Sequence, residues 1–441
     1  MADPPVGPLP VQAPAIAHAV AAAEACGDWD LALSGYRLLL SQQPCNHVWL
    51  CNAARACWYL DRPHFSLQLY CRALRLRPQD PVPWLGLANA LRDLNRYEAA
   101  DSSYRRSRSL APSAISAWNH SQLLLGLQRY AEAYGLAEER ATLPELEPYR
   151  PIQALPQPLD PARLCLWSEQ GFGDTFQYLR WCVALAQAGA PLMLELEAPL
   201  AALAQEGLRW LGVPLAVQVK QPDPPPLAVG VSAASLLSLP HHLGGAPLGH
   251  LFEPTRRAGV WQGYLRSDQW PLRSPSTQPR VGLVWASGRK LDHPFTAREY
   301  RKRSLPEPAL AHLIQGLHSA GAVLVDLQFG PDRALANPWR HHFPLELPPD
   351  ATFALNAQWI RQLDLLISVD TASAHLAGAL GHPCWVVLPF SADPRWLRHR
   401  SDSPWYPSLR LFRQPATGQW EPVIDAVLEA FRAWWPSVAG S

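Results

Sequence analysis

The residues best suited to chemistry follow a short apolar segment near the C-terminus. That segment, 365–369 (LLISV), predicts a strand, and the alanine-rich segment 371–380 after it predicts a helix. The turn between them carries an acid, hydroxyls, a small residue and a histidine: Asp370, Thr371, Ser373, Ala372 and His375. Free backbone N–H groups and the positive end of a helix dipole make such a turn a seat for phosphate.

An ordinary helix cap is the alternative interpretation of this turn. Asp370 or Thr371 would then only accept a hydrogen bond from the first turn of the helix. The helix continues with small residues, which let a phosphate come close to the backbone: Ala374, Ala377 and Gly378. This context favours a phosphate site.

A second turn follows the apolar segment 163–167 (RLCLW), which also predicts a strand. Glycines permit a tight turn, and an acid stands at the start of the next predicted helix, 175–188; the residues are Gln170, Gly171, Gly173 and Asp174. A carboxylate at this position can act as general base on an acceptor hydroxyl. A helix-capping acid is again the alternative.

Positive charge is concentrated between Arg280 and Arg303. This segment holds seven basic and two acidic residues, a local balance of +5 in a chain whose formal net charge is +1. The segment reads as a loop after a strand, and a diphosphate is the natural counterion for its arginines. A solvated basic loop is the alternative.

Several other chemistries lack their sequence patterns. The histidine pairs 241–242 and 341–342 have no companion cysteines or carboxylates at zinc-site spacing, so we expect no metal. The acid pair of Asp28-Trp29-Asp30 lies among helical repeats and reads as a turn between helices. No Walker loop, G-x-S-x-G turn or basic–aromatic stripe occurs, and the net charge of +1 gives no reason to expect nucleic acid as a partner.

The two turns require two parallel sheets to position them. A strand, a glycine turn, a helix and a further strand at 192–196 follow one another as in a βαβ unit. A second α/β block opens at Arg280, with predicted strands at 281–286, 323–327, 365–369 and 384–389 and helices at 307–320, 358–362 and 371–380. We expect Rossmann-type lobes at 162–275 and 278–420, closed by a helix at 421–436. Because ligands bind beyond the carboxyl ends of such strands, both turns should face one cleft.

The first part of the chain repeats itself. Proline recurs at Pro44, Pro78 and Pro112, and tyrosine at Tyr36, Tyr70 and Tyr104, each 34 residues apart. This period is typical of tetratricopeptide repeats, helix pairs that stack into a superhelix. Units should begin near residues 13, 47, 81 and 115. The fourth lacks the closing proline and runs one residue short after its first helix, which suggests a cap or a junction. We expect repeats over 13–146 and a proline-rich linker over 147–161.

The remaining composition suits a globular protein of a reducing compartment. None of the eight cysteines forms a C-x-x-C pair, and we expect buried free thiols. The chain contains no run of 18 or more apolar residues, so we expect no membrane span and a cytoplasmic location.

Five stretches resemble a known group of proteins: 168–181 (SEQGFGDTFQYLRW), 281–288 (VGLVWASG), 301–306 (RKRSLP), 367–390 (ISVDTASAHLAGALGHPCWVVLPF) and 393–414 (DPRWLRHRSDSPWYPSLRLFRQ). They are similar to bacterial tetratricopeptide-repeat proteins whose C-terminal half resembles the heptosyltransferase-like glycosyltransferases. The repeat-plus-lobes layout also looks like the protein O-GlcNAc transferases. The resemblance covers nearly the whole chain.

This resemblance implies a GT-B fold and an inverting, metal-independent transfer from a sugar nucleotide, with no cofactor. Asp174 matches the family's base, and Arg303 matches the basic residue that contacts the donor diphosphate. The other donor positions that it implies are Lys302, Trp285, Ser287, Asp370, Thr371, Ala372, Ser373 and His375. Ala372 departs from the glycine common in heptosyltransferases, so the resemblance does not identify the sugar.

Three hypotheses follow for function. The first is a glycosyltransferase whose repeats hold a protein or peptide acceptor, or a partner, on their concave face. The second is an adaptor with catalytically degenerate lobes, and the third is a sugar-nucleotide epimerase of the same fold. The sequence identifies neither donor nor acceptor.

Overall fold

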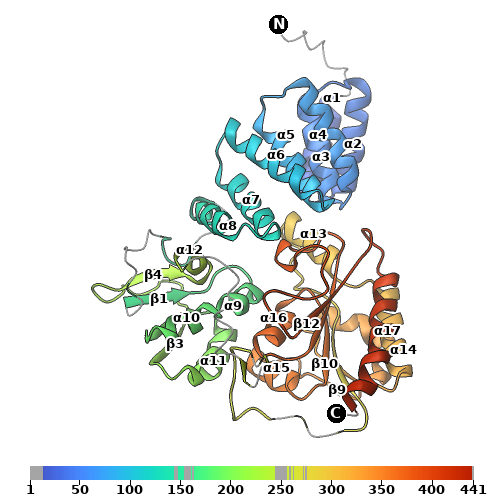
Figure 1. Cartoon of the computed structure of the whole chain (residues 1–441). Helices are drawn as coiled ribbons and strands as arrows, with labels where there is room; N and C mark the ends of the chain where they lie inside the picture. The colour runs from blue at the N-terminus through green and yellow to red at the C-terminus, as the bar shows by residue number, and fades with distance from the viewer. Residues whose placement is uncertain are drawn as a thin grey trace. The chain divides into compact units, whose positions relative to one another are not determined.

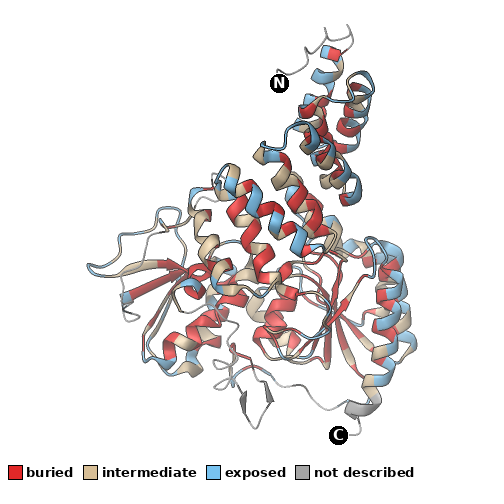
Figure 2. Cartoon of the chain, turned by 45° about the horizontal axis from the view of Figure 1, so that its top comes forward, coloured by how far each residue is buried: buried red, intermediate tan, exposed pale blue. Residues whose placement is uncertain are grey.

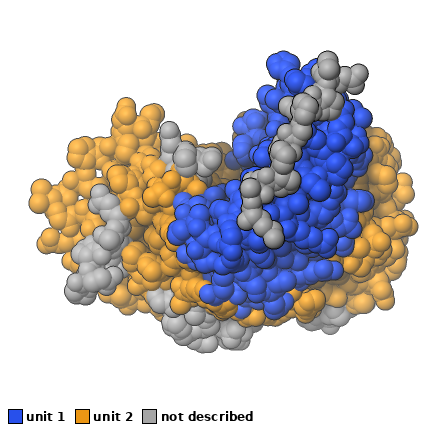
Figure 3. All heavy atoms as spheres, turned by 90° about the horizontal axis from the view of Figure 1, so that it is seen from above, with its two compact units in different colours: residues 1–127, 290–302 blue, residues 128–289, 303–441 orange. Residues whose placement is uncertain are grey.

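A computed structural model describes residues 13–143, 148–152, 160, 163–243, 256–257, 260–261, 263–271, 273 and 276–439. The chain forms two compact units, coloured separately in Figure 3. Unit 1 comprises Met1–Leu127 and Lys290–Lys302, and unit 2 comprises Gln128–Arg289 and Arg303–Ser441. The predicted linker 147–161 lies largely outside the described residues.

Antiparallel helix pairs build unit 1 (Figure 1). Its repeat helices are α1 (Ala13–Ala25), α2 (Trp29–Gln42), α3 (His47–Tyr59), α4 (Pro63–Leu76), α5 (Pro81–Asp93), α6 (Tyr97–Leu110) and α7 (Ala114–Gly126). The small residues Ala54 and Ala88 are fully buried between helices, as the repeat pattern requires. The Tyr70 ring packs so closely on Gly86 that a Cβ there would lie 2.1 Å from it. Asp28 caps α2 from the turn between helices, as predicted, whereas Asp30 lies in the first turn of α2 itself.

The fourth repeat is shortened at a different place from the one predicted. Its N-cap Ser113 follows Asp80, the N-cap of α5, by 33 residues, and α8 (Tyr130–Ala137) likewise begins 33 residues after α6. The missing residue therefore lies before α7, and the prediction that it follows the first helix is wrong. The fully buried Ala117 takes the helix position that Trp84 has in α5, so Trp118 was a misleading guide to register.

Part of the basic segment folds as a helix within unit 1, not as the predicted loop. Helix α13 (Pro294–Arg303) contributes Arg298, whose side chain is 1% exposed. Its Nη2 lies 2.6 Å from Asp93 Oδ2 and 2.7 Å from Asp61 Oδ1. The guanidinium also sits 4.4 Å from the ring centroid of Trp58. Arg298 therefore meets neither solvent nor a phosphate, because carboxylates of the repeats neutralise it.

Asp93 is the centre of this contact. The carboxyl is buried, which by itself raises its pKa, but Arg298 and Lys302 outweigh burial and lower the pKa below its usual value. Trp58 Nε1 also donates to Asp93 Oδ2 at 2.7 Å. One buried carboxylate, that of Asp93 in α5, thus joins α5 to the side chains of α13.

Substituting Arg298 by leucine should destabilise unit 1 by about 3–5 kcal/mol, because Asp93 would stay buried without its main partner. Urea denaturation, with hydrogen exchange of α13 peptides, measures the effect. Arg301→Ala is the matched control, since Arg301 is an exposed arginine of the same helix and should cost about 0.5 kcal/mol or less. The pair Arg298→Met with Asp93→Asn should recover part of the loss. A loss for Arg298→Leu as small as the control's would show that these ion pairs do not hold α13.

The first lobe of unit 2 contains a parallel sheet of order β3-β2-β1-β4. Its strands are β1 (Leu164–Trp167), β2 (Leu192–Leu196), β3 (Leu215–Val219) and β4 (Ser232–Ser235). Its helices are α9 (Phe172–Tyr178), α10 (Trp181–Gln187), α11 (Ala198–Gly207) and α12 (Leu239–His242). The helix predicted over 175–188 is thus two helices. The buried Arg180 lies at the break, where its Nε donates to the Gln177 carbonyl at 2.8 Å.

The second lobe contains a parallel sheet of order β12-β11-β10-β7-β8-β9. Its strands are β7 (Arg280–Val284), β8 (Val323–Asp326), β9 (Leu345–Glu346), β10 (Leu365–Val369), β11 (Cys384–Leu388) and β12 (Leu409–Arg413). Its helices are α14 (Glu307–Ser319), α15 (Phe353–Ile360), α16 (Ala372–Ala379) and α17 (Glu421–Ala439). The central strands of both sheets are largely buried (Figure 2), whereas the edge strands β3 and β9 contain no buried residue.

Short elements complete the described chain. They are a hairpin of β5 (Arg256–Arg257) and β6 (Val260–Trp261) and the 3₁₀ helices η1 (Glu138–Thr142), η3 (Arg209–Leu211), η4 (Leu236–Ser238), η6 (Pro331–His342) and η7 (Pro394–Trp396). Helical repeats followed by two parallel α/β lobes confirm the predicted fold class.

The cysteines and helices bear on two further expectations. Five cysteines are buried and Cys71 is half-buried, but Cys26 and Cys45 are exposed, so the expectation of buried thiols is wrong for these two. Both lie at or just after helix ends, outside the helix interfaces. Within the described residues, every helix is too short or too polar to cross a bilayer.

Candidate active site

The turn after β10 begins α16 with its first backbone amides uncovered by a side-chain cap. Thr371 is the N-cap residue in an extended conformation, yet its side chain makes no capping hydrogen bond. Its hydroxyl lies 3.1 Å from Ser368 Oγ instead. The helix-cap alternative is therefore not realised at Thr371, and the positive end of α16 is left for another acceptor.

Asp370 lies at the end of β10, buried beside two predicted site residues. Its Oδ2 is 3.9 Å from Arg303 Nη1, and its Oδ1 is 3.8 Å from His375 Nε2. Arg303 Nη1 also donates to the Asp370 carbonyl at 3.4 Å. Burial raises the pKa of Asp370, and the charge of Arg303 opposes this rise.

His375 is a neutral imidazole at neutral pH. Its side chain is 4% exposed, and its Nδ1 lies 2.9 Å from the Tyr406 hydroxyl. The ring of Trp396 lies 5.1 Å away, centroid to centroid. Burial, with the nearby charge of Arg395, lowers the pKa of His375 well below its usual value.

The turn after β1 places Asp174 in the first turn of α9. The Gly171 N–H donates to Asp174 Oδ2 at 3.0 Å, so the capping alternative is realised here. Gln170, immediately before, has a φ of 67°, a left-handed conformation that is uncommon outside glycine. Such backbone strain is frequent at functional sites.

The two turns converge within unit 2. A Cβ on Gly173 would lie 2.8 Å from His375 Cδ2, so α9 and α16 touch at this glycine (Figure 1). Arg395 Nη2 lies 2.7 Å from Asp174 Oδ1, which joins the lobes through an ion pair. The convergence on which the sequence argument depended is therefore present.

Arg395 is a site residue that the sequence analysis missed. It lies in η7, after β11, and Asp393 holds its Nε at 2.9 Å. The charges of Asp393 and Asp174 overcome burial and raise the pKa of Arg395 well above its usual value. The available signal was its place in 393–414, a stretch used for the resemblance but not searched for site residues.

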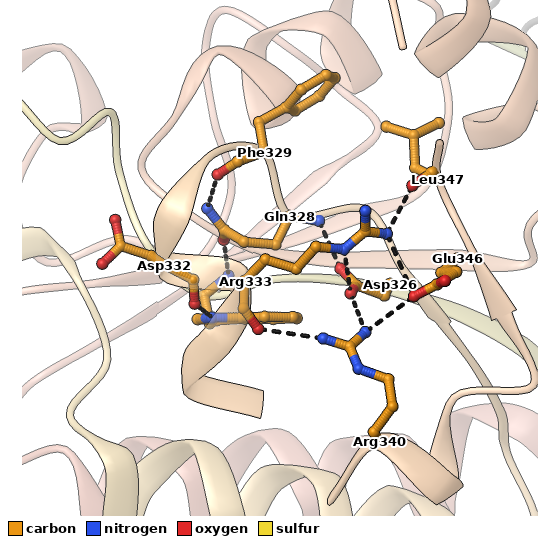
Figure 4. Close-up of polar contacts among 9 residues, drawn as sticks. Asp326, Gln328, Phe329, Asp332, Arg333, Arg340, Glu346 and Leu347 are labelled. Carbon is orange, nitrogen blue, oxygen red and sulfur yellow. Dashed lines mark hydrogen bonds and ion pairs between the residues drawn. The ribbon is translucent and has the colours of Figure 1, made fainter. Parts of the chain in front are cut away.

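Trp285 and Ser287 follow β7 in a turn that one side chain organises. Gln328 Oε1 accepts from the Trp285 N–H at 3.0 Å and the Ala286 N–H at 2.9 Å. Its Nε2 donates to the Phe329 carbonyl at 2.8 Å (Figure 4) and to the Ala286 carbonyl at 3.2 Å. The Trp285 side chain is buried and donates to the Asp332 carbonyl, so the structure places it in the core of the lobe.

Ser287 differs from Trp285, because its hydroxyl is buried without a hydrogen-bond partner among the described residues. Its N–H donates to Ser304 Oγ at 3.1 Å, which ties the turn to the residue after Arg303. A buried hydroxyl with an unused hydrogen-bonding group is a candidate ligand contact.

Two arginines of η6 are already neutralised by acidic residues at the ends of β8 and β9. Asp326 is fully buried, with Arg333 Nε 2.7 Å away and Arg340 Nη1 also paired to it (Figure 4). Glu346 makes a further contact with Arg340 Nη1 at 3.2 Å.

The remaining predicted residues take different places. Ser373 is buried, and its Oγ lies 3.4 Å from Asn356 Nδ2. Lys302 belongs to unit 1, where it pairs with Glu299 at 2.7 Å. Among the described residues, no group of three or more His, Cys, Asp or Glu side chains is placed to hold a metal ion.

Comparisons with known proteins give a partial relationship. No protein-family model matches the chain. Protein FlbA of Caulobacter vibrioides is 28% identical over 409 residues, which is 83% of this chain and 64% of FlbA, so the chain spans less than two thirds of that relative.

Two solved structures cover the lobes or the whole chain. Escherichia coli ADP-heptose lipopolysaccharide heptosyltransferase II is 14% identical over 62% of this chain and 98% of its own, with a TM-score of 0.41. A mutant O-GlcNAc transferase of Thermobaculum terrenum is 15% identical over 98% of this chain and 94% of its own, with a TM-score of 0.34. In architecture, this chain has helical repeats followed by two parallel α/β lobes. At these scores the likeness does not assign a reaction to it.

Substituting Gly173 by alanine should destabilise unit 2 by about 1–3 kcal/mol, because the new methyl group overlaps the packed His375 ring. Thermal or urea denaturation gives the measurement. Gly288→Ala is the matched control, since a Cβ there meets no atom within 4 Å. Equal stability of the two variants would mean that α9 and α16 are not in contact in solution.

Acidification should also weaken unit 2 through His375. The folded pKa lies below the unfolded value of about 6.5, so the stability that neutral His375 provides is present above pH ~6.5 and is lost as pH falls below it. The loss is about 1.4 kcal/mol per pH unit, until the folded pKa is reached. Urea denaturation from pH 7.5 to 4.5 should therefore show a shallower decline for His375→Gln. The exposed His64 provides the control substitution, His64→Gln, and a decline unchanged by His375→Gln would contradict the prediction.

Proposed function

We propose that unit 2 is an inverting, metal-independent glycosyltransferase that uses a sugar-nucleotide donor. The observation that carries this proposal is the meeting of two strand-end turns, joined by the Asp174–Arg395 ion pair and the Gly173–His375 contact. One turn offers a carboxylate and the other offers helix amides with an arginine. These are the two groups that an acid–base transfer from a diphosphate needs.

The donor diphosphate would bind at the start of α16. The uncapped amides of this helix end, the guanidinium of Arg303 and the free hydroxyl of Ser287 are the groups that support this placement. When the bond between the sugar and the diphosphate breaks, negative charge develops on the leaving phosphate oxygen. Fixed dipoles and an arginine stabilise that charge without reorganising, which lowers the barrier.

Asp174 would be the general base. Its carboxylate takes the proton of an acceptor hydroxyl while the acceptor oxygen bonds to the anomeric carbon from the face opposite the leaving diphosphate. Configuration at the anomeric carbon is inverted in this single displacement. The contact between α9 and α16 supports the assignment, because it brings the base to the donor turn.

The repeats of unit 1 would hold a peptide acceptor or partner. Val48, Val82 and Ile115 are the second residues of α3, α5 and α7, and they are 57%, 60% and 44% exposed. Equivalent positions of stacked repeats lie on one face, so these side chains form an apolar row suited to an extended chain.

An adaptor with inactive lobes is the second candidate, and one observation favours it. Both oxygens of Asp174 are occupied, one by the Gly171 amide and one by Arg395. Both contacts are ones that a purely structural capping carboxylate would make.

A donor screen tests the proposal. Thermal shift with UDP-, GDP- and ADP-sugars should reveal one stabilising donor, by about 2.7 kcal/mol at 100 times its Kd. Mass detection of released or transferred sugar then measures turnover. Asp174→Asn should still bind the donor and lose about 10²–10⁴-fold in rate, because the base is removed. Asp223→Asn changes an exposed carboxylate of the same lobe and is the control.

Each outcome separates the candidates. No stabilisation by any donor, together with no released sugar, would leave the adaptor. Turnover unchanged by Asp174→Asn would remove Asp174 as the base. A changed sugar configuration in the nucleotide product, formed without acceptor, would identify an epimerase instead.

A further inference from the structure

Arg395 holds both sides of the site at once. Its Nη2 pairs with Asp174 at 2.7 Å and its Nη1 donates to Gln177 Oε1 at 2.9 Å, so two groups of α9 share its free end. Its Nε is held by Asp393 of its own loop at 2.9 Å. The guanidinium is therefore anchored at Nε, while its outer nitrogens reach across to the other lobe.

The occupied state of Asp174 is at odds with its proposed role. This step rests on the function proposed above. The Gly171 amide contacts Oδ2 and Arg395 contacts Oδ1, so both oxygens of Asp174 already have a partner when an acceptor hydroxyl approaches. When Asp174 takes a proton it becomes neutral, and Arg395 then lies beside a carboxyl group that no longer balances its charge. Proton transfer is therefore favoured when Arg395 has a new anionic partner.

The charge of Arg395 already acts on the donor turn. Together with Arg303 it opposes the rise in the pKa of Asp370, and it contributes to the low pKa of His375. Burial alone would raise the pKa of Asp393, but Arg395 outweighs burial and lowers it to about 2, so this anchor stays charged. A diphosphate at the start of α16 would thus lie within the field of Arg395 and compete with Asp174 for it.

We propose that Arg395 is an exchange residue: the donor diphosphate takes its outer nitrogens from Asp174 and thereby frees the base. Anchored by Asp393, the side chain changes partner without leaving the site. Binding of the diphosphate and release of Asp174 from Arg395 then occur together, in a single equilibrium. Arg395 contacts the leaving group, and acceptor activation is withheld until a donor is present, which limits the enzyme to an order in which the donor binds first.

Thermodynamic linkage gives a direct test through binding, without any transfer. Calorimetry with UDP, GDP and ADP identifies the diphosphate that the wild-type chain binds. Arg395→Ala should weaken that diphosphate at least ~10-fold, as loss of a charge-assisted contact requires. Asp174→Asn should tighten it several-fold, because Arg395 no longer has to leave a carboxylate.

The double variant separates exchange from a general charge effect. Removing any carboxylate near a bound diphosphate raises the affinity for the diphosphate, because less negative charge repels it. This general effect remains when Arg395 is absent. Asp174→Asn should therefore tighten diphosphate binding by a smaller factor in the Arg395→Ala background than in the wild-type chain. The difference between the two factors measures the exchange. An equal gain in both backgrounds would overturn the proposal.

A structural role for Arg395 predicts a different pattern. If it only clamps the lobes, Arg395→Ala weakens the matching nucleoside, monophosphate and diphosphate by the same factor. Exchange instead predicts a loss that is largest for the diphosphate and small for the nucleoside, with partial recovery in Arg395→Lys. If the wild-type chain binds no nucleoside diphosphate, both the proposed function and the exchange are wrong. If it binds one, but Arg395→Ala weakens nucleoside, monophosphate and diphosphate equally, only the exchange is wrong.

Discussion

The ion pair between Asp174 and Arg395 is the constraint on which the site in unit 2 depends. Asp174 belongs to a helix of the first lobe, and Arg395 belongs to a loop of the second. Neither side chain is more than 21% exposed, so each charge would be costly without the other. Because the pair is made of groups that can also serve a reaction, the contact that joins the lobes and the chemistry proposed between them are the same interaction.

Buried arginines recur wherever distant parts of the chain meet. Arg298 reaches Asp93 across 205 positions, and Arg180 donates to the Trp405 carbonyl across 225. A buried ion pair adds little net stability, because desolvation offsets attraction, but leaving one partner alone is expensive. Such contacts therefore act mainly by excluding other arrangements, which suits helices whose apolar surfaces would pack in more than one register.

Local patterns made most of the fold predictable, and long-range charge pairing limited the rest. The 34-residue period and the two strand–turn–helix motifs are short-range signals, and both turns lie where they were expected. The basic segment was misread because the partners of Arg298 are in repeats far away in sequence, so its charge looked free. Arg395 was missed for the same reason, since nothing beside it in the sequence reveals that it meets Asp174.

The charge of the assembled site explains why a diphosphate would change its contacts. Three carboxylates, those of Asp174, Asp370 and Asp393, face the two guanidinium groups of Arg303 and Arg395, while His375 is neutral. Carboxylates of the site thus already contact both of these guanidinium groups, so an anion gains the charge of either arginine only when that arginine changes partner. The arginines at β8 offer little relief, because Asp326 and Glu346 hold them. The amides of α16 belong to the backbone and cannot change partner in this way. The contact of Arg303 with Asp370 is 3.9 Å long, and the contact of Arg395 with Asp174 is closer, at 2.7 Å. The pair between the lobes is thus the one whose exchange both admits an anion and exposes a base.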